Sequence, residues 1–246
     1  MHPWRILFWS LLIALLAFAD FAGRASGRIT SLPADAFYRY GTAVAAIVGD
    51  GFLLLIVVLI GARLPLRRAL ALRPPASWRD AAVVGAGVLL FGYVVSFAVS
   101  FALPGLVREQ EVPVFWDPSR AGAFAANFFA IAVFVPVFEE ALCRGLGYTL
   151  LEPFGAAAAV VLTALAFALA HGAVVDFPVL LATGLGLGYL RYRAGSLYPC
   201  IALHGAAQDV TAGAGLVGER RAQVAPENRS AGGRGESSKH QHPSSR

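Results

Sequence analysis

Long apolar runs separated by short polar segments dominate the first 215 residues of the chain. Seven of these runs approach or reach the roughly 20 residues that a helix needs to cross a hydrocarbon core about 30 Å thick. They predict membrane spans near residues 6–21, 41–62, 81–103, 122–150, 154–172, 177–190 and 197–215. The sixth run is short, and the fourth is long enough to project from the membrane. The pattern therefore predicts an all-α fold, a polytopic transmembrane helix bundle.

Composition supports this class of protein. Of the 246 residues, 57% are hydrophobic and only 14% are charged, which is more apolar surface than one soluble core can bury. The first run follows "MHPWR" and precedes the small residues "AGRASG", as in a signal peptide, but its length favours an uncleaved anchor. The two cysteines, Cys143 and Cys200, both fall in apolar runs and indicate neither a disulfide framework nor a metal site.

The arginines predict how the chain is oriented in a cell membrane. Residues 63–80 hold five arginines and one aspartate, so we expect this loop in the cytoplasm. Residues 104–121 hold two arginines and three acids and are expected outside, whereas Arg191 and Arg193 return the chain to the inside. These loops place the amino terminus in the cytoplasm and the carboxyl terminus outside, in a multi-pass arrangement.

The last residues and the overall charge indicate no catalytic or nucleic-acid-binding site. Residues 216–246 lack apolar periodicity and are rich in Gly, Ser and charge, which predicts a disordered polar tail. The chain has no Gly-rich phosphate loop and no Lys/Arg patch interleaved with aromatic residues, so we expect no nucleic-acid partner. The net charge of +5 is instead typical of contact with a membrane surface.

Ionisable residues interrupt the apolar runs at three places. The stretch "VFEEALCRG", residues 137–145, carries Glu139, Glu140 and Arg144, and the fifth and seventh runs carry His171 and His204. A charged group at mid-bilayer costs about 2.5–3.5 kcal/mol on insertion scales, so each needs a local reason. At a rise of about 1.5 Å per residue, all three places fall near the middle of the bilayer.

The spacing of these residues predicts their pairing and their chemistry. Glu140 and Arg144 stand at i and i+4 and are expected to pair on one helix face. Glu139 points about 100° away and needs a partner from another span, for which a histidine is the natural candidate. Glu139 with His171 is suited to deprotonating a water, and His204 with the amide of Gln208, one turn on, is suited to stabilising an oxyanion. Together these groups are typical of peptide hydrolysis.

Residues 121–214 also resemble the CAAX protease and bacteriocin-processing (CPBP, or Abi) family of intramembrane endopeptidases. That family carries EExxxR, FxxxH and HxxxN on successive helices. The first two motifs are here Glu139-Glu140-Ala-Leu-Cys-Arg144 and Phe167-Ala-Leu-Ala-His171. In the third, His204 is present, but Gln208 stands where the family has Asn.

The resemblance implies roles for these positions. Glu139 and His171 would activate water, Glu140 and Arg144 would organise the site, and His204 would serve the oxyanion hole. It also implies a reaction without a metal, so we expect no cofactor. The longer Gln208 side chain moves its amide donor, and loss of one oxyanion donor costs about 100–1,000-fold in turnover.

Several alternatives stay open at this level. The charged group on the fourth span is also suited to fixing helix packing, and Asp50 in "IVGDGF" is equally suited to function or structure. Two histidines and a glutamate, as in His171, His204 and Glu139, form one known set of catalytic zinc ligands, so zinc is a minor alternative. Other readings are a catalytically eroded scaffold or immunity protein of the same fold and, with less support, a transporter.

We therefore expect an intramembrane endopeptidase that cleaves a membrane-associated protein or lipidated peptide, with membrane lipid as a further partner. Its organisation is predicted as accessory transmembrane helices over residues 1–120, a four-helix catalytic core over 121–215, and the polar tail over 216–246.

Overall fold

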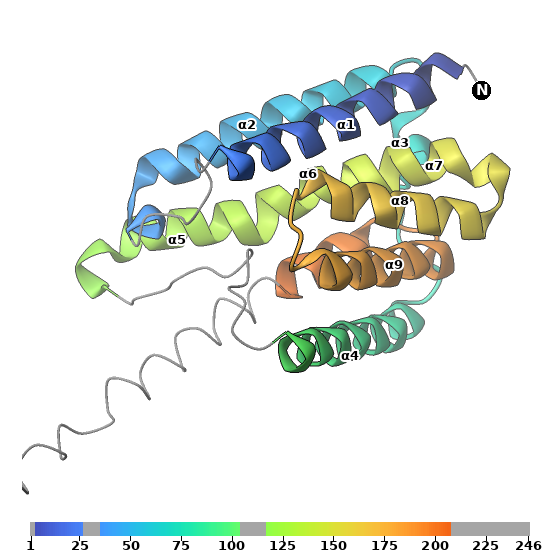
Figure 1. Cartoon of the computed structure of the whole chain (residues 1–246). Coiled ribbons are helices and arrows are strands. Elements are labelled where there is room, and N and C mark those ends of the chain that lie inside the picture. The colour runs from blue at the N-terminus through green and yellow to red at the C-terminus, as the bar shows by residue number, and fades with distance from the viewer. Residues whose placement is uncertain (1–2, 27–34, 104–116, 208–246) are drawn as a thin grey trace, which may run out of the picture.

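The computed structural model describes residues 3–26, 35–103 and 117–207, and all regular structure within them is helical (Figure 1). The α-helices are α1 (Pro3–Ala25), α2 (Tyr40–Ile60), α3 (Leu66–Ala69), α4 (Trp78–Ala102), α5 (Ala121–Phe129), α6 (Val135–Glu140), α7 (Tyr148–Leu151), α8 (Ala156–Ala170) and α9 (Phe177–Ala194). A further helix covers residues 198–207. The π-helical segments are η3 (Ala130–Phe134) and η4 (Ala141–Gly147), and they join α5, α6 and α7 into one long interrupted helix.

Four helices of the described residues are long and apolar enough to cross a membrane. They are Pro3–Ala25, Tyr40–Ile60, Trp78–Ala102 and the interrupted helix Pro118–Phe154. Large apolar side chains face outward, as lipid contact requires, and on α4 Phe97 and Phe101 are 75% and 80% exposed. The predicted all-α membrane bundle is confirmed. The count of seven spans stays a prediction, because α8 is a shorter apolar helix of 15 residues.

The helices form successive layers across the bundle, and their order in space differs from their order in the chain (Figure 1). Helices α1 and α2 lie side by side over the interrupted helix, α8 and α9 follow, and α4 covers the outer side of α9. Glycines on α9 permit this close packing: a Cβ on Gly184 would lie 2.9 Å from the Ala164 Cα, and one on Gly188 would lie 3.1 Å from Val160 Cγ1. Small residues thus bring α8 and α9 together, as is typical of membrane helix interfaces.

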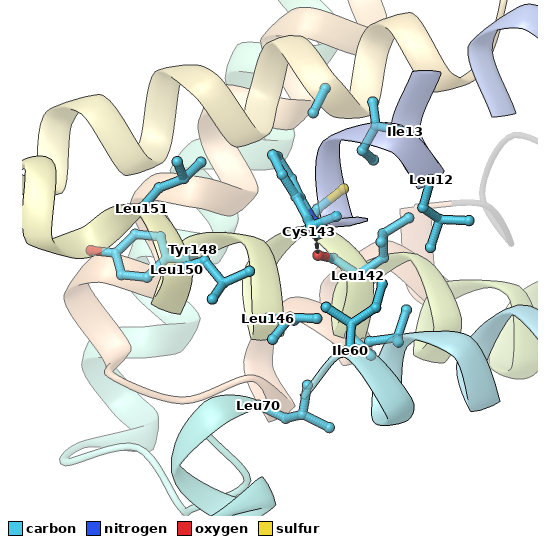
Figure 2. Close-up of a cluster of buried hydrophobic side chains, with 14 of the residues drawn as sticks. Leu12, Ile13, Ile60, Leu70, Leu142, Cys143, Leu146, Tyr148, Leu150 and Leu151 are labelled. Carbon is cyan, nitrogen blue, oxygen red and sulfur yellow. Dashed lines mark hydrogen bonds between the residues drawn. The ribbon is translucent and has the colours of Figure 1, made fainter. Parts of the chain in front are cut away.

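The largest buried apolar cluster surrounds the second half of the interrupted helix (Figure 2). Leu142, Leu146 and Leu150 are buried in it, as are Leu12 and Ile13 from α1. Polar contacts hold α1 in the same place, because Trp9 Nε1 donates to the Leu142 carbonyl at 2.9 Å and Arg5 Nη2 donates to the Ala62 carbonyl at 2.9 Å. The first helix is therefore part of the core.

The arginine-rich segment is fixed at one end of the bundle. Arg73 Nε donates to the Gly195 carbonyl at 2.8 Å, Ser196 Oγ donates to the Arg73 carbonyl at 2.5 Å, and Leu197 N donates to the Ala71 carbonyl at 3.1 Å. The beginning of α1 lies at this same end (Figure 1). The segments expected in the cytoplasm thus share one end of the bundle, while the membrane side that this end faces stays a prediction.

Candidate active site

Two π-helical segments shape the helix that carries the acidic pair. Glu139 and Glu140 end α6, between η3 and η4, and Arg144 lies within η4. Pro136 has no N–H to donate to the carbonyl four residues earlier, which disfavours regular α-helix at this point. The sequence predicted one long span over residues 122–150, and the structure has one helix there, Pro118–Phe154, with two π-helical segments that the sequence analysis did not predict. Such π-helical turns are frequent at functional sites because they redirect side chains.

Glu140 and Arg144 form the predicted pair. Arg144 Nη1 donates to Glu140 Oε1 at 3.0 Å, and both side chains are completely buried. Arg144 Nη2 donates to the Gly184 carbonyl at 3.1 Å, and the guanidinium carbon lies 4.4 Å from the centre of the Phe167 ring. The arginine therefore links the interrupted helix to α8 and α9.

His204 is anchored by the same carboxylate. Its Nδ1 lies 2.9 Å from Glu140 Oε1, and because a carboxylate only accepts, Nδ1 carries the proton. Its Nε2 lies 3.6 Å from Glu139 Oε2. The next residue, Gly205, lies against the Ala132 carbonyl so closely that a Cβ would overlap the oxygen. Close helix contact at Gly205 thus brings His204 to both glutamates.

Glu139 has the interhelical partners that the sequence predicted. Its Oε1 lies 3.6 Å from His171 Nε2, so its carboxylate stands between the His171 and His204 rings. Glu139 and His171 are 18% and 19% exposed, which leaves them open to a small reactant, whereas Glu140 and Arg144 are not.

His171 is held at the end of α8. The sequence placed it inside the fifth span, but it is the C-cap of α8, and Gly172 follows with a φ of 56° that favours glycine. Its Nδ1 lies 2.8 Å from the Phe167 carbonyl, which assigns the proton to Nδ1. The unprotonated Nε2 of the neutral ring therefore faces Glu139.

Two carboxylate oxygens in this cluster lack a hydrogen-bond donor within the described part of the chain. They are Glu139 Oε2 and Glu140 Oε2, and both are buried. Buried acceptors without a donor are costly, so they are uncommon in folded proteins. Glu139 Oε2 thus keeps an unused acceptor position, 3.6 Å from His204 Nε2.

The remaining candidates are placed as follows. Gln208 lies outside the described residues, as does the segment 216–246. Cys143 is buried in the apolar cluster, in agreement with a packing role. Asp50, half-buried on α2, interacts electrostatically with Glu139. No group of three or more His, Cys, Asp or Glu side chains able to hold a metal ion occurs within residues 3–26, 35–103 and 117–207.

Sequence reasoning overlooked two residues of α1 beside this cluster. Arg24 Nη2 donates to the His171 carbonyl at 3.4 Å, and Asp20 interacts electrostatically with His171 and Glu139. The available signal was the position of Asp20 inside an apolar run, the criterion that drew attention to Glu139 and Asp50.

Comparison with known proteins gives one match. Residues 121–208 match the family model described as "Type II CAAX prenyl endopeptidase Rce1-like". No curated protein and no solved structure matches the chain. The matched segment contains Glu139, Glu140, Arg144, His171 and His204, all of which the fold brings together. The match supports the resemblance of this segment to the CAAX protease (CPBP) family.

Proposed function

We propose that the protein is an intramembrane endopeptidase in which Glu139 and His171 activate the hydrolytic water. The family suggests endopeptidase activity. One observation carries the proposed mechanism: the Glu139 carboxylate stands between two imidazoles, with each of its oxygens 3.6 Å from a ring Nε2. A carboxylate flanked in this way is suited to act as a general base.

The first step forms a tetrahedral intermediate. The neutral His171 ring accepts a hydrogen bond from the water at Nε2, because its Nδ1 donates to the Phe167 carbonyl. Glu139 takes a proton from the water, and the hydroxide oxygen attacks the carbonyl carbon of the scissile peptide. The electron pair of the C=O bond moves to the carbonyl oxygen, which becomes an oxyanion.

The second step breaks the peptide bond. His204 donates from Nε2 to the oxyanion while its Nδ1 stays bound to Glu140, which requires the imidazolium form with two donors. The Gln208 amide would supply a second donor. Protonated Glu139 then delivers its proton to the leaving nitrogen, the C–N bond breaks, and a carboxyl group and an amine are released. Arg144 acts by holding Glu140 in place.

The setting of the reaction is part of the same proposal. Four apolar helices support a membrane protein, and we place it as a multi-pass protein of the cell membrane with the arginine-rich end in the cytoplasm. A site at the depth of the glutamates is suited to a membrane-associated protein or lipidated peptide, with lipid as the surrounding partner. The proposed mechanism requires no metal cofactor.

A cleavage assay in ¹⁸O-labelled water tests the proposal. The metal-stripped protein, reconstituted in lipid vesicles, is incubated with a library of lipidated peptides, and products are identified by mass spectrometry. We expect cleavage that places one ¹⁸O in the new carboxyl group and is unchanged by chelator. Cleavage only after zinc is restored would overturn the metal-free mechanism, and no cleavage of any peptide would favour a scaffold that has lost catalysis.

A further inference from the structure

We propose that Asp20 and Arg24 of α1 are positioning residues for the Glu139–His171 pair, so that the working site extends beyond the family-matched segment 121–208. The inference deepens the proposed function and rests on it for its activity measurement. Its geometric basis is the contact between α1 and the end of α8, where His171 is the C-cap.

The backbone around His171 is held by α1. Arg24 Nη2 donates to the His171 carbonyl at 3.4 Å. At the neighbouring Gly172, a Cβ would lie 2.6 Å from the Asp20 Cβ and 2.9 Å from the Phe21 backbone nitrogen, so α1 lies directly against the glycine. The Phe167 carbonyl fixes the ring of His171, and α1 fixes the backbone from which that ring projects.

The charges on α1 act on the same pair. Asp20 and Arg24 stand at i and i+4 in the favourable acid-before-base order, and Asp20 interacts electrostatically with Arg24, His171 and Glu139. Other titratable or charged groups around the pair are Asp50 on α2, Glu140, Cys143 and Arg144 on the interrupted helix, and His204 on helix 198–207.

A merely structural role for α1 makes a different prediction. If Asp20 only supported folding, the nearly isosteric Asp20→Asn change would alter stability without altering how the site titrates. If Asp20 acts on the Glu139–His171 pair, the same change alters the pH at which these two groups bind a proton. Asp35 offers a matched control, because it pairs with Arg39 at 2.8 Å on an exposed surface.

The experiment compares Asp20→Asn and Asp35→Asn in the full chain. We expect Asp20→Asn to move the acidic limb of the pH profile of kcat/KM to lower pH, because removing a negative charge disfavours protonation of nearby groups. The Asp35→Asn profile should match that of the wild type. In histidine-labelled protein, the NMR titration midpoint of His171, assigned with a His171→Gln variant, should fall in the same way for Asp20→Asn.

The NMR measurement separates this inference from the proposed function. A lowered His171 midpoint in a protein that cleaves no peptide would support the positioning role and contradict the protease. Cleavage by the wild type, combined with an unchanged His171 midpoint in Asp20→Asn, would overturn the role of Asp20.

The role of Arg24 is tested by measuring kcat and KM separately for two variants. We expect Arg24→Leu to lower kcat by about 10–100-fold at unchanged KM, because a displaced catalytic group costs rate rather than binding, and Arg24→Lys to recover part of the loss. Equal losses in both variants, or a change in KM alone, would overturn the role of Arg24. If Arg24→Leu does not fold, the Asp20→Asn titration still decides between the two accounts.

Discussion

Two arginine–carboxylate pairs in this protein share sequence spacing and distance but differ in burial. Arg144 and Glu140 meet at 3.0 Å with both side chains 0% exposed, and Arg39 and Asp35 meet at 2.8 Å with side chains 59% and 39% exposed. Removing one partner of a buried pair leaves an unpaired buried charge and costs about 3–5 kcal/mol, whereas exposed pairs contribute at most about 1 kcal/mol. We therefore expect Glu140→Gln to lower the free energy of unfolding several-fold more than Asp35→Asn.

The magnitude follows from what Arg144 keeps when the charge on Glu140 is removed. Its remaining contacts are the Gly184 carbonyl at 3.1 Å and the Phe167 ring at 4.4 Å. A cation–π contact contributes about 2 kcal/mol when desolvated, which does not replace a buried carboxylate. Glu140→Gln also weakens the 2.9 Å contact to His204, so turnover should fall together with stability.

Equilibrium unfolding in mixed micelles, followed by circular dichroism, measures this difference. The double variant Glu140→Gln/Arg144→Met removes both charges and should be more stable than Glu140→Gln alone, because no unpaired charge remains. The reasoning is refuted if Glu140→Gln costs no more than Asp35→Asn, or if the double variant loses the sum of the two single losses.

Two further predictions concern helix contact and topology. Gly205→Ala would force its helix away from the Ala132 carbonyl and displace His204, so we expect kcat to fall about 100-fold, as for a roughly 1 Å misplacement; Gly92→Ala, with open space around it, should leave kcat unchanged, and equal activity in both variants would refute the packing argument. Cysteines introduced at Arg67 and Ser237 should be labelled from the cytoplasmic and the outer side respectively, and labelling of both from one side would contradict an odd number of spans.

The sequence alone predicts most helix positions, because apolar length and local spacing determine them. The second predicted span, 41–62, corresponds to Tyr40–Ile60, and the third, 81–103, corresponds to Trp78–Ala102. The π-helical turns around Glu139 were not predictable in this way. They coincide with Pro136, a local feature, but also with the close approach of Gly205, which only the packed bundle brings about.

The candidate site was predictable to a similar extent. The pairing of Glu140 with Arg144 follows from i,i+4 spacing, and a histidine partner for Glu139 follows from its lack of a cation on its own helix. The contact from Arg24 to His171 spans 147 residues and depends on how α1 crosses the end of α8. Sequence spacing carries no information about that crossing, so Arg24 was not among the candidate residues of the sequence analysis.

The central claim is that Glu139 is the general base, and a paired comparison of glutamate variants tests it most directly. Single-turnover cleavage is measured for the wild type, for Glu139→Gln and for Glu152→Gln, which changes an exposed glutamate at the end of the same interrupted helix. Loss of a general base costs about 100–10,000-fold, so we predict a loss of this size for Glu139→Gln with an unchanged unfolding midpoint, and the wild-type rate for Glu152→Gln. Cleavage by Glu139→Gln at the wild-type rate would contradict the account.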